Sequence, residues 1–169
     1  MDKHYQPKFQ EEYSAKIPAL TLLTSLGWTF LSPKQIMDYR GYKQDEVVLR
    51  PVLREELSKR SFMAGGKTCQ LSEKALDNLI SQVCSPALNE GLLKANERMY
   101  NHLLYGIAVT EFVDGKKVNP TIALIDWEHP ENNQFHFTEE FTVLRSGGVE
   151  TRRPGIVCFV NGIPLAVIE

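Results

Sequence analysis

The segment GIVCFVNGIPLAVIE, residues 155–169, decides the fold that the sequence predicts. Two apolar runs flank Asn161 and Gly162, and an Asn-Gly pair between such runs is the strongest short-range signal for a β-hairpin. Both runs are apolar on both faces, which is typical of strands covered on two sides. The sequence therefore predicts a central hairpin here, with the carboxylate of Glu169 at its open end.

The length of the hairpin loop decides which residue faces Glu169. If three residues form the loop, Gly155 lies directly opposite Glu169 and on the same face of the sheet. If only Asn161 and Gly162 form it, the two residues point to opposite faces, because a slip of one residue turns every side chain over. In the first register, a second carboxylate at position 155 would let two carboxylates bind one divalent metal. The alternative is that Glu169 only ends a strand.

The rest of the chain divides into a helical half and a half rich in strands. Apolar spacing, N-cap residues and terminal glycines predict five helices, within residues 11–28, 32–41, 50–63, 71–84 and 89–106. Ser32 is the expected N-cap of the second helix, and the fourth is expected to start at Ser72 and to place Leu76, Leu79, Ile80 and Val83 together. The third is expected to bury Val52, Leu53, Leu57 and Phe62, and the fifth to carry a stripe of Leu92, Asn96, Met99 and Leu103. Short apolar runs between turns predict strands over 107–169. The predicted fold is a single α/β domain over residues 1–169, a mixed sheet flanked by helices.

Composition excludes several classes of protein. The formal net charge of the 169 residues is −2, so binding to nucleic acid would require a local basic patch. The sequence has no run of about eighteen apolar residues and no signal-peptide core, so we expect no membrane segment and a cytoplasmic location. The three cysteines, Cys69, Cys84 and Cys158, are expected to be reduced thiols.

Three other motifs favour structural rather than catalytic interpretations. GGKT (65–68) resembles the end of a phosphate-binding loop, but Ser61 stands where that pattern needs its first glycine, which favours a plain loop between helices. The four histidines show no metal-ligand spacing with one another or with cysteine. IDWEHPENNQFHF (125–137) is typical of a structured loop in which Asn132 and Asn133 bond the backbone.

The most specific blocks of the sequence carry a resemblance to a known family. From KIPALTLLTSLGW (16–28) through IDWEHPENN (125–133) to RRPGIVCFVNGIPLAVIE (152–169), the chain resembles the N-terminal region of the restriction (R) subunit of type I restriction-modification enzymes. The resemblance implies a nuclease domain of the restriction-endonuclease-like PD-(D/E)xK fold. In that family two ATP-driven motor domains and a helical assembly region follow, which this sequence lacks, so ATP would act only through them.

The resemblance also assigns candidate site residues. In the family an aspartate follows RRP, and a lysine stands two residues beyond the glutamate of VIE; the two carboxylates bind Mg²⁺ and the lysine assists attack on the phosphodiester. By position, Glu169 matches the glutamate and Gly155 stands where the aspartate is expected. The lysine would be residue 171, beyond the given sequence. Glu12 is a looser match to an acidic residue that such nucleases place near the metal.

The function implied by the resemblance is Mg²⁺-dependent cleavage of double-stranded DNA, without base recognition by this domain. The expected partners are DNA and the methyltransferase and specificity subunits of the type I complex. Because Gly155 replaces the aspartate and the lysine is absent, we expect this chain to be inactive. The alternative is a non-catalytic, nuclease-like module that docks in the restriction complex; an enzyme acting on a small molecule is a third, less favoured reading.

Overall fold

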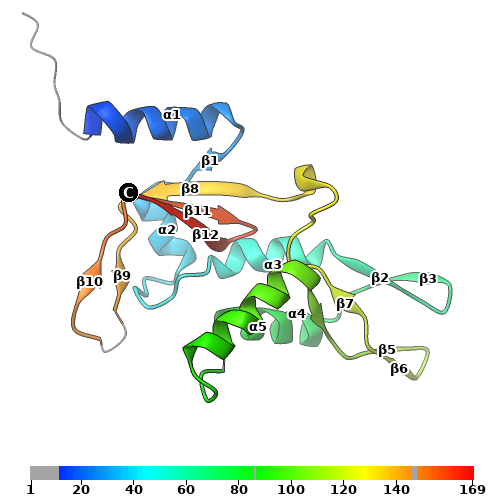
Figure 1. Cartoon of the computed structure of the whole chain (residues 1–169). Coiled ribbons are helices and arrows are strands. Elements are labelled where there is room, and N and C mark those ends of the chain that lie inside the picture. Colours follow the sequence, from blue (N-terminus) through cyan, green and yellow to red (C-terminus); the bar gives the residue numbers. More distant parts are fainter. Residues whose placement is uncertain (1–11, 86, 146–147) are drawn as a thin grey trace, which may run out of the picture.

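A four-stranded mixed sheet forms the centre of the computed structural model, which describes residues 12–85, 87–145 and 148–169 (Figure 1). The strand order is β1-β8-β11-β12. β1 runs parallel to β8, whereas β8, β11 and β12 are successively antiparallel. The four strands are β1 (Thr29–Phe30), β8 (Phe135–Glu139), β11 (Ile156–Val160) and β12 (Ile163–Ile168).

Helices cover both faces of this sheet, as the α/β prediction requires. On one face, a π-helical turn η1 (Glu12–Lys16) leads into α1 (Ile17–Ser25), and Leu23 packs on Phe137, Ile156 and Cys158. The other face is covered by α2 and α3 (Figure 1). These two helices are α2 (Pro33–Tyr39) and α3 (Arg50–Ser58). No helix within the described ranges is long and apolar enough to cross a membrane.

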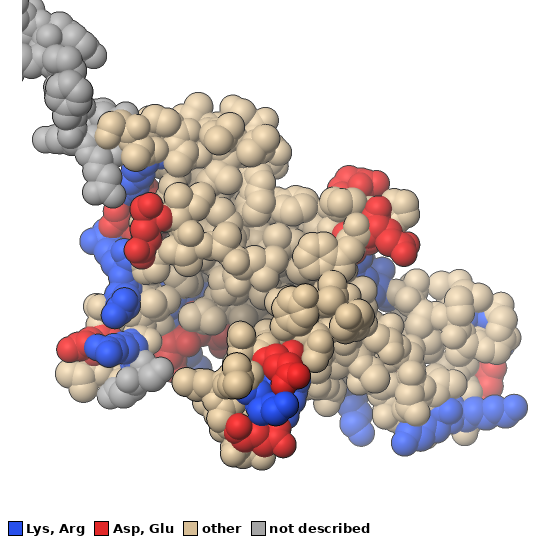
Figure 2. Space-filling model, in the orientation of Figure 1, with Lys and Arg blue, Asp and Glu red and all other residues tan. Residues whose placement is uncertain are grey.

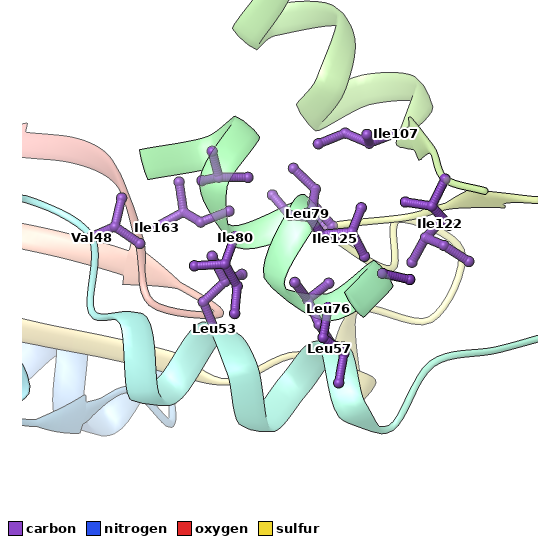
Figure 3. Packing of buried hydrophobic residues seen from close by; sticks show 14 of the residues in the cluster. Val48, Leu53, Leu57, Leu76, Leu79, Ile80, Ile107, Ile122, Ile125 and Ile163 are labelled. Atoms are coloured by element: carbon purple, nitrogen blue, oxygen red, sulfur yellow. The ribbon is translucent and has the colours of Figure 1, made fainter. Parts of the chain in front are cut away.

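The largest hydrophobic cluster lies beside the sheet, where α3 packs on α4. Leu53 of α3 lies beside Ile80 of α4, and Leu57 lies beside Leu76 (Figure 3). Two further helices and a set of two-stranded sheets complete the chain. They are α4 (Glu73–Cys84), α5 (Leu92–Tyr105), the 3-10 turn η2 (Pro130–Asn132), and the pairs β2 (Ser61–Ala64) with β3 (Lys67–Gln70), β4 (Ile107–Ala108) with β7 (Thr121–Ile122), β5 (Glu111–Val113) with β6 (Lys116–Val118), and β9 (Val143–Leu144) with β10 (Thr151–Arg152).

The predicted helix starts are confirmed at two caps. The Ser32 side chain accepts a hydrogen bond from the Gln35 backbone N–H, and the Gln35 side chain accepts one from the Ser32 backbone N–H, which is a capping box. Ser72 caps α4 through the Ala75 N–H. The stripe expected on α4 is buried throughout: Leu76, Leu79, Ile80 and Val83.

The prediction for the third helix is wrong beyond Ser58. Val52, Leu53 and Leu57 are buried as expected, but Phe62 belongs to strand β2. Consequently GGKT is not a loop between helices: Gly65 and Gly66 form the turn of the β2–β3 hairpin. Both glycines have positive φ, the backbone region that a tight hairpin turn requires and that glycine adopts without strain.

Two further predictions need correction. The stripe expected on the fifth helix is covered only in part: Leu103 packs against the core, but Leu92 is 77% exposed, and Ala95 is the buried residue of α5. Only one of the two strands of the terminal hairpin lies inside the sheet. β11 is buried at every position, but β12 is the edge strand and its residues 165–168 are exposed.

Candidate functional site

The terminal hairpin brings Gly155 and Glu169 together at one end of the sheet. β11 and β12 pair antiparallel with Ile156 opposite Ile168 and Val157 opposite Val167. One step beyond the last ladder pair, position 155 faces position 169, and residues directly opposite in such a ladder share a face. The two residues also line one small pocket of about 80 Å³. Its other walls come from Ile156 and Ile168 and from η1 and α1: Ala15, Lys16 and Ala19.

The register arises by a route that neither predicted loop describes. Val160 pairs with Ile163, so Asn161 and Gly162 alone form the loop. With that loop and a regular ladder, position 155 would face 168. The register shifts within the hairpin, since Phe159 pairs with Pro164 but Cys158 pairs with Ala166. The shift leaves Leu165 as the extra residue of a β-bulge, next to a proline that cannot donate to the ladder. The bulge restores the pairing of 155 with 169.

The loop itself is fixed by both of its residues. Asn161 and Gly162 have φ of +51° and +80°, the combination of a type I′ turn. A Cβ on Gly162 would lie 2.6 Å from the Leu49 carbonyl oxygen, so a side chain there would collide with the start of α3. In addition, the Leu49 N–H donates to the Gly162 carbonyl at 2.8 Å. The hairpin is thereby anchored on α3.

Charged side chains beside the pocket are already paired with one another. Lys16 Nζ lies 2.8 Å from Glu139 Oε2 and 2.6 Å from Glu140 Oε1. Arg153 Nε lies 2.5 Å from Glu140 Oε2. Hydrogen bonding to Glu139 and Glu140 raises the pKa of Lys16, and the bond from Lys16 lowers the pKa of Glu140. Both glutamates therefore neutralise cations of the chain itself.

The residues present do not fit a magnesium ion. Gly155 offers no ligand, so the hairpin supplies only the carboxylate of Glu169. Within residues 12–85, 87–145 and 148–169, no three His, Cys, Asp or Glu side chains gather in a way that could hold a metal. Mg²⁺ in proteins is usually bound by one or two carboxylates together with waters and substrate oxygens in an octahedral shell. The side chain of Glu12 lies outside the described residues, so its proposed role stays a prediction.

The IDWEHPENN block holds the hairpin loop in place and is not part of the pocket. Asn133 Oδ1 accepts from the Asp126 N–H at 2.9 Å and from Asn161 Nδ2 at 2.8 Å. Asn161 Nδ2 also donates to the Leu124 carbonyl at 2.9 Å, and its Oδ1 accepts from the Gln134 N–H at 2.8 Å. The two most specific blocks of the sequence therefore meet in one buried network. The expectation of backbone bonds is confirmed for Asn133, whose Nδ2 donates to the Asp126 and Pro130 carbonyls. It is wrong for Asn132, whose Nδ2 donates to the side-chain Oδ2 of Asp126.

Sequence reasoning missed the residues that surround the candidate pair. Lys16, at the start of α1, gave no signal because its partners lie more than 120 positions away in the sequence. Asn161 was identified only as a turn residue, although its side chain is fully buried. An asparagine chosen for its turn geometry and a buried hydrogen-bonding asparagine look the same in a single sequence. All three cysteines are free thiols, as expected.

Comparisons with known proteins agree with the resemblance. The family model described as Type I restriction enzyme R protein N terminus matches residues 8–169. The type I restriction enzyme HindI endonuclease subunit of Haemophilus influenzae is 31% identical over 160 residues, which cover 90% of this chain and 14% of that protein. The putative type I restriction enzyme MjaVIIIP endonuclease subunit of Methanocaldococcus jannaschii is 28% identical over 149 residues, covering 87% of this chain and 13% of that protein.

A second protein of Methanocaldococcus jannaschii, the putative type I restriction enzyme MjaIXP endonuclease subunit, is 25% identical over 170 residues, or 96% of this chain. That alignment covers 15% of the relative. The chain thus spans only a small part of the length of the curated relatives that it matches. Since the family model covers almost the whole chain, the chain belongs to the family of N-terminal regions of type I restriction enzyme R proteins.

Proposed function

We propose that this chain is a nuclease domain of the PD-(D/E)xK fold from the R subunit of a type I restriction enzyme, in which position 155 no longer supplies a metal ligand. The names of the relatives, which call each an endonuclease subunit, support the first half of the proposal. The hairpin that places positions 155 and 169 side by side at the end of a mixed sheet supports the choice of fold. The second half, that position 155 supplies no metal ligand, is supported by the absence of a side chain at Gly155.

The parent reaction is hydrolysis of a phosphodiester of double-stranded DNA with Mg²⁺. When bound between two carboxylates, such a metal lowers the pKa of a water and neutralises charge on the phosphodiester. In this chain Glu169 is exposed and makes no ion pair with another described residue, so it is available as one ligand. Opposite it, Gly155 has no side chain, and a Cβ there would lie 3.2 Å from the Ile168 carbonyl oxygen. The hairpin therefore supplies one of the two carboxylate ligands.

A second candidate function is favoured by the same glycine. A domain that keeps the hairpin and its network but lacks the ligand would serve as a non-catalytic, nuclease-like module of the restriction complex. In that complex its partners would be the methyltransferase and specificity subunits and the DNA. Any use of ATP would belong to the motor domains of the longer relatives. Measuring cleavage separates this module from a working nuclease.

The 169-residue chain is expected not to nick supercoiled plasmid in the presence of Mg²⁺. Loss of one contact to the transition state raises the barrier, and every ~1.4 kcal/mol lowers the rate about tenfold. The measurement is conversion of supercoiled to open-circular plasmid on a gel, with the Glu169→Ala variant run in parallel. The two proteins should give the same background. Nicking by the parent chain that disappears in the Glu169→Ala variant would show that Gly155 does not prevent catalysis.

A further inference from the structure

Two glycine-lysine turns that are far apart in the sequence lie together in the fold. One is the GGK turn (65–67) of the β2–β3 hairpin, and the other is the DGKK turn (114–117) of the β5–β6 hairpin. Lys67 Nζ lies 3.3 Å from Asp114 Oδ2, which joins the two tips. Both hairpins extend from the same end of the molecule, away from the C-terminal end of β12 (Figure 1). We call these two tips the paired hairpins.

The paired hairpins carry a local positive charge on a chain whose net charge is −2. Lys67, Lys116 and Lys117 are all exposed, and Figure 2 shows Lys and Arg side chains along the outer end where β5 and β6 lie. Within the described part of the chain, Lys116 and Lys117 make no ion pair. Glu111 does not offset them at the surface, because it is buried and accepts a hydrogen bond from the Ser72 N–H at 2.7 Å.

Asp114 is the one acidic side chain exposed on these tips, and it holds Lys67 only weakly. Both side chains of the pair are mostly exposed, at 69% for Lys67 and 73% for Asp114. Exposed ion pairs of this kind contribute little to stability, because water and salt screen both charges. A phosphate oxygen can therefore replace Asp114 as the partner of Lys67 at little cost.

The outer faces of the hairpins also expose large apolar side chains beside polar ones. Phe112 is 70% exposed and lies directly opposite Lys117 in the β5–β6 ladder. Met63 is 67% exposed and lies opposite Thr68 in the β2–β3 ladder. Phe62 and Ala64, which flank Met63, point the other way, into the core, and Val113 beside Phe112 packs against the same cluster. The inner face of each hairpin thus packs on the core, and the outer face is available to a partner.

We propose that the paired hairpins bind the phosphate backbone of duplex DNA through Lys67, Lys116 and Lys117. The choice of DNA as the occupant rests on the proposed function, whose substrate is duplex DNA. The major groove admits a two-stranded β-ribbon, and a lysine ammonium binds phosphate as a point charge. The three cations contact phosphates and carry no base-reading fork, so the contact positions DNA without selecting sequence. This is a holding site, separate from the pocket at Gly155 and Glu169.

The test is the salt dependence of binding to a labelled duplex, measured by fluorescence anisotropy with the 169-residue chain. The logarithm of the affinity falls linearly with the logarithm of salt concentration, with a slope of about −0.9 per neutralised phosphate. The variant Lys67→Ala, Lys116→Ala, Lys117→Ala is expected to reduce that slope by about 2 to 3. The matched control is Lys34→Ala, Lys43→Ala, Lys74→Ala, which removes the same charge from exposed lysines outside the hairpins and should leave the slope unchanged.

A single isosteric variant tests the proposal in the opposite direction. Asp114→Asn removes the competing carboxylate, and asparagine tolerates the positive φ of +51° at this position. The Asp114→Asn chain should bind duplex more tightly than the parent, whereas a folding defect would weaken binding. The proposal is overturned if the parent does not bind duplex at low salt, if the control variant loses as much slope as the hairpin variant, or if Asp114→Asn has no effect. Metal binding by a Gly155→Asp chain reports on the proposed nuclease site alone, so the two proposals can fail independently.

Discussion

Replacing Asn161 by glycine is expected to lower the free energy of unfolding by about 3 kcal/mol, and replacing it by alanine by about 4 kcal/mol. The side chain of Asn161 is fully buried and makes three hydrogen bonds, to Gln134, Leu124 and Asn133. Its removal leaves the Gln134 N–H and the Leu124 carbonyl without a partner. Each such buried group costs about 1–3 kcal/mol.

The difference in unfolding free energy between the Asn161→Gly and Asn161→Ala variants measures the backbone strain at position 161. Asn161 has a φ of +51°, where glycine is unstrained and alanine costs about 1–2 kcal/mol. Urea denaturation followed by circular dichroism measures both values. Asn132→Ala is the control, because Asn132 is exposed and donates one bond to Asp126 Oδ2; it should cost no more than about 1 kcal/mol. Equal stability of the Asn161→Gly, Asn132→Ala and parent chains would mean that the buried network does not hold the loop.

Local signals in the sequence identified the elements whose causes are local. Ser32 and Ser72 cap helices as predicted, since a cap depends on residues within one turn. Asn161 and Gly162 form the expected hairpin turn for the same reason. The stripe on α4 could be predicted because Leu76, Leu79, Ile80 and Val83 follow the helical period along one face. In each case the necessary information lies within about a dozen residues.

Predictions failed where distant partners decide the structure. Phe62 fits the helical period of residues 50–63, but it lies in strand β2 and belongs to the buried cluster that contains Ile107 and Ile122. Leu92 has the right spacing for a buried stripe, yet Ala95 is the buried residue of α5. Edge and centre strands cannot be told apart in one hairpin, because both runs are apolar, so the exposure of β12 was missed.

The candidate site shows the same division between local and distant causes. The spacing of fourteen residues predicted that positions 155 and 169 face each other in one of the two possible registers. With a two-residue loop they do so only because a bulge beside Pro164 shifts the register. A proline in a strand is a hint of such a bulge. Lys16 and its bonds to Glu139 and Glu140 could not be anticipated, because they join the first helix to the end of β8.

Replacing Gly155 by aspartate is expected to create a binding site for Mg²⁺ or Mn²⁺, with an affinity at least about tenfold above that of the parent chain, or ~1.4 kcal/mol. The new carboxylate would stand opposite Glu169, so two carboxylates could share one ion while waters complete its octahedral shell. The backbone accepts the change. A Cβ at position 155 would lie 3.2 Å from the Ile168 carbonyl oxygen, so this exposed end of β12 need shift only by a few tenths of an ångström.

The ammonium of Lys16 would not neutralise the two carboxylates at positions 155 and 169. Lys16 lines the same pocket, but its ammonium is already held by Glu139 and Glu140 at 2.8 and 2.6 Å. A chain extended so that a lysine stands at position 171 would place that lysine on the face of Glu169, because side chains alternate along a strand. This extension is expected to improve cleavage of DNA rather than affinity for the metal, since an ammonium is not a metal ligand.

Calorimetric titration with Mg²⁺ and with Mn²⁺ measures the repaired site, and two variants control for its interpretation. Gly155→Asn has the shape of aspartate without its charge, so it carries the same steric cost and should bind no metal. Glu169→Ala in the Gly155→Asp chain removes the opposite ligand and should abolish the gain. Tight binding that survives Glu169→Ala would place the ion elsewhere, for example on Glu139 and Glu140 after displacement of Lys16. If the Gly155→Asp chain binds metal no better than the Gly155→Asn chain, then Glu169 is not half of a metal site, and the hairpin serves only to close the sheet.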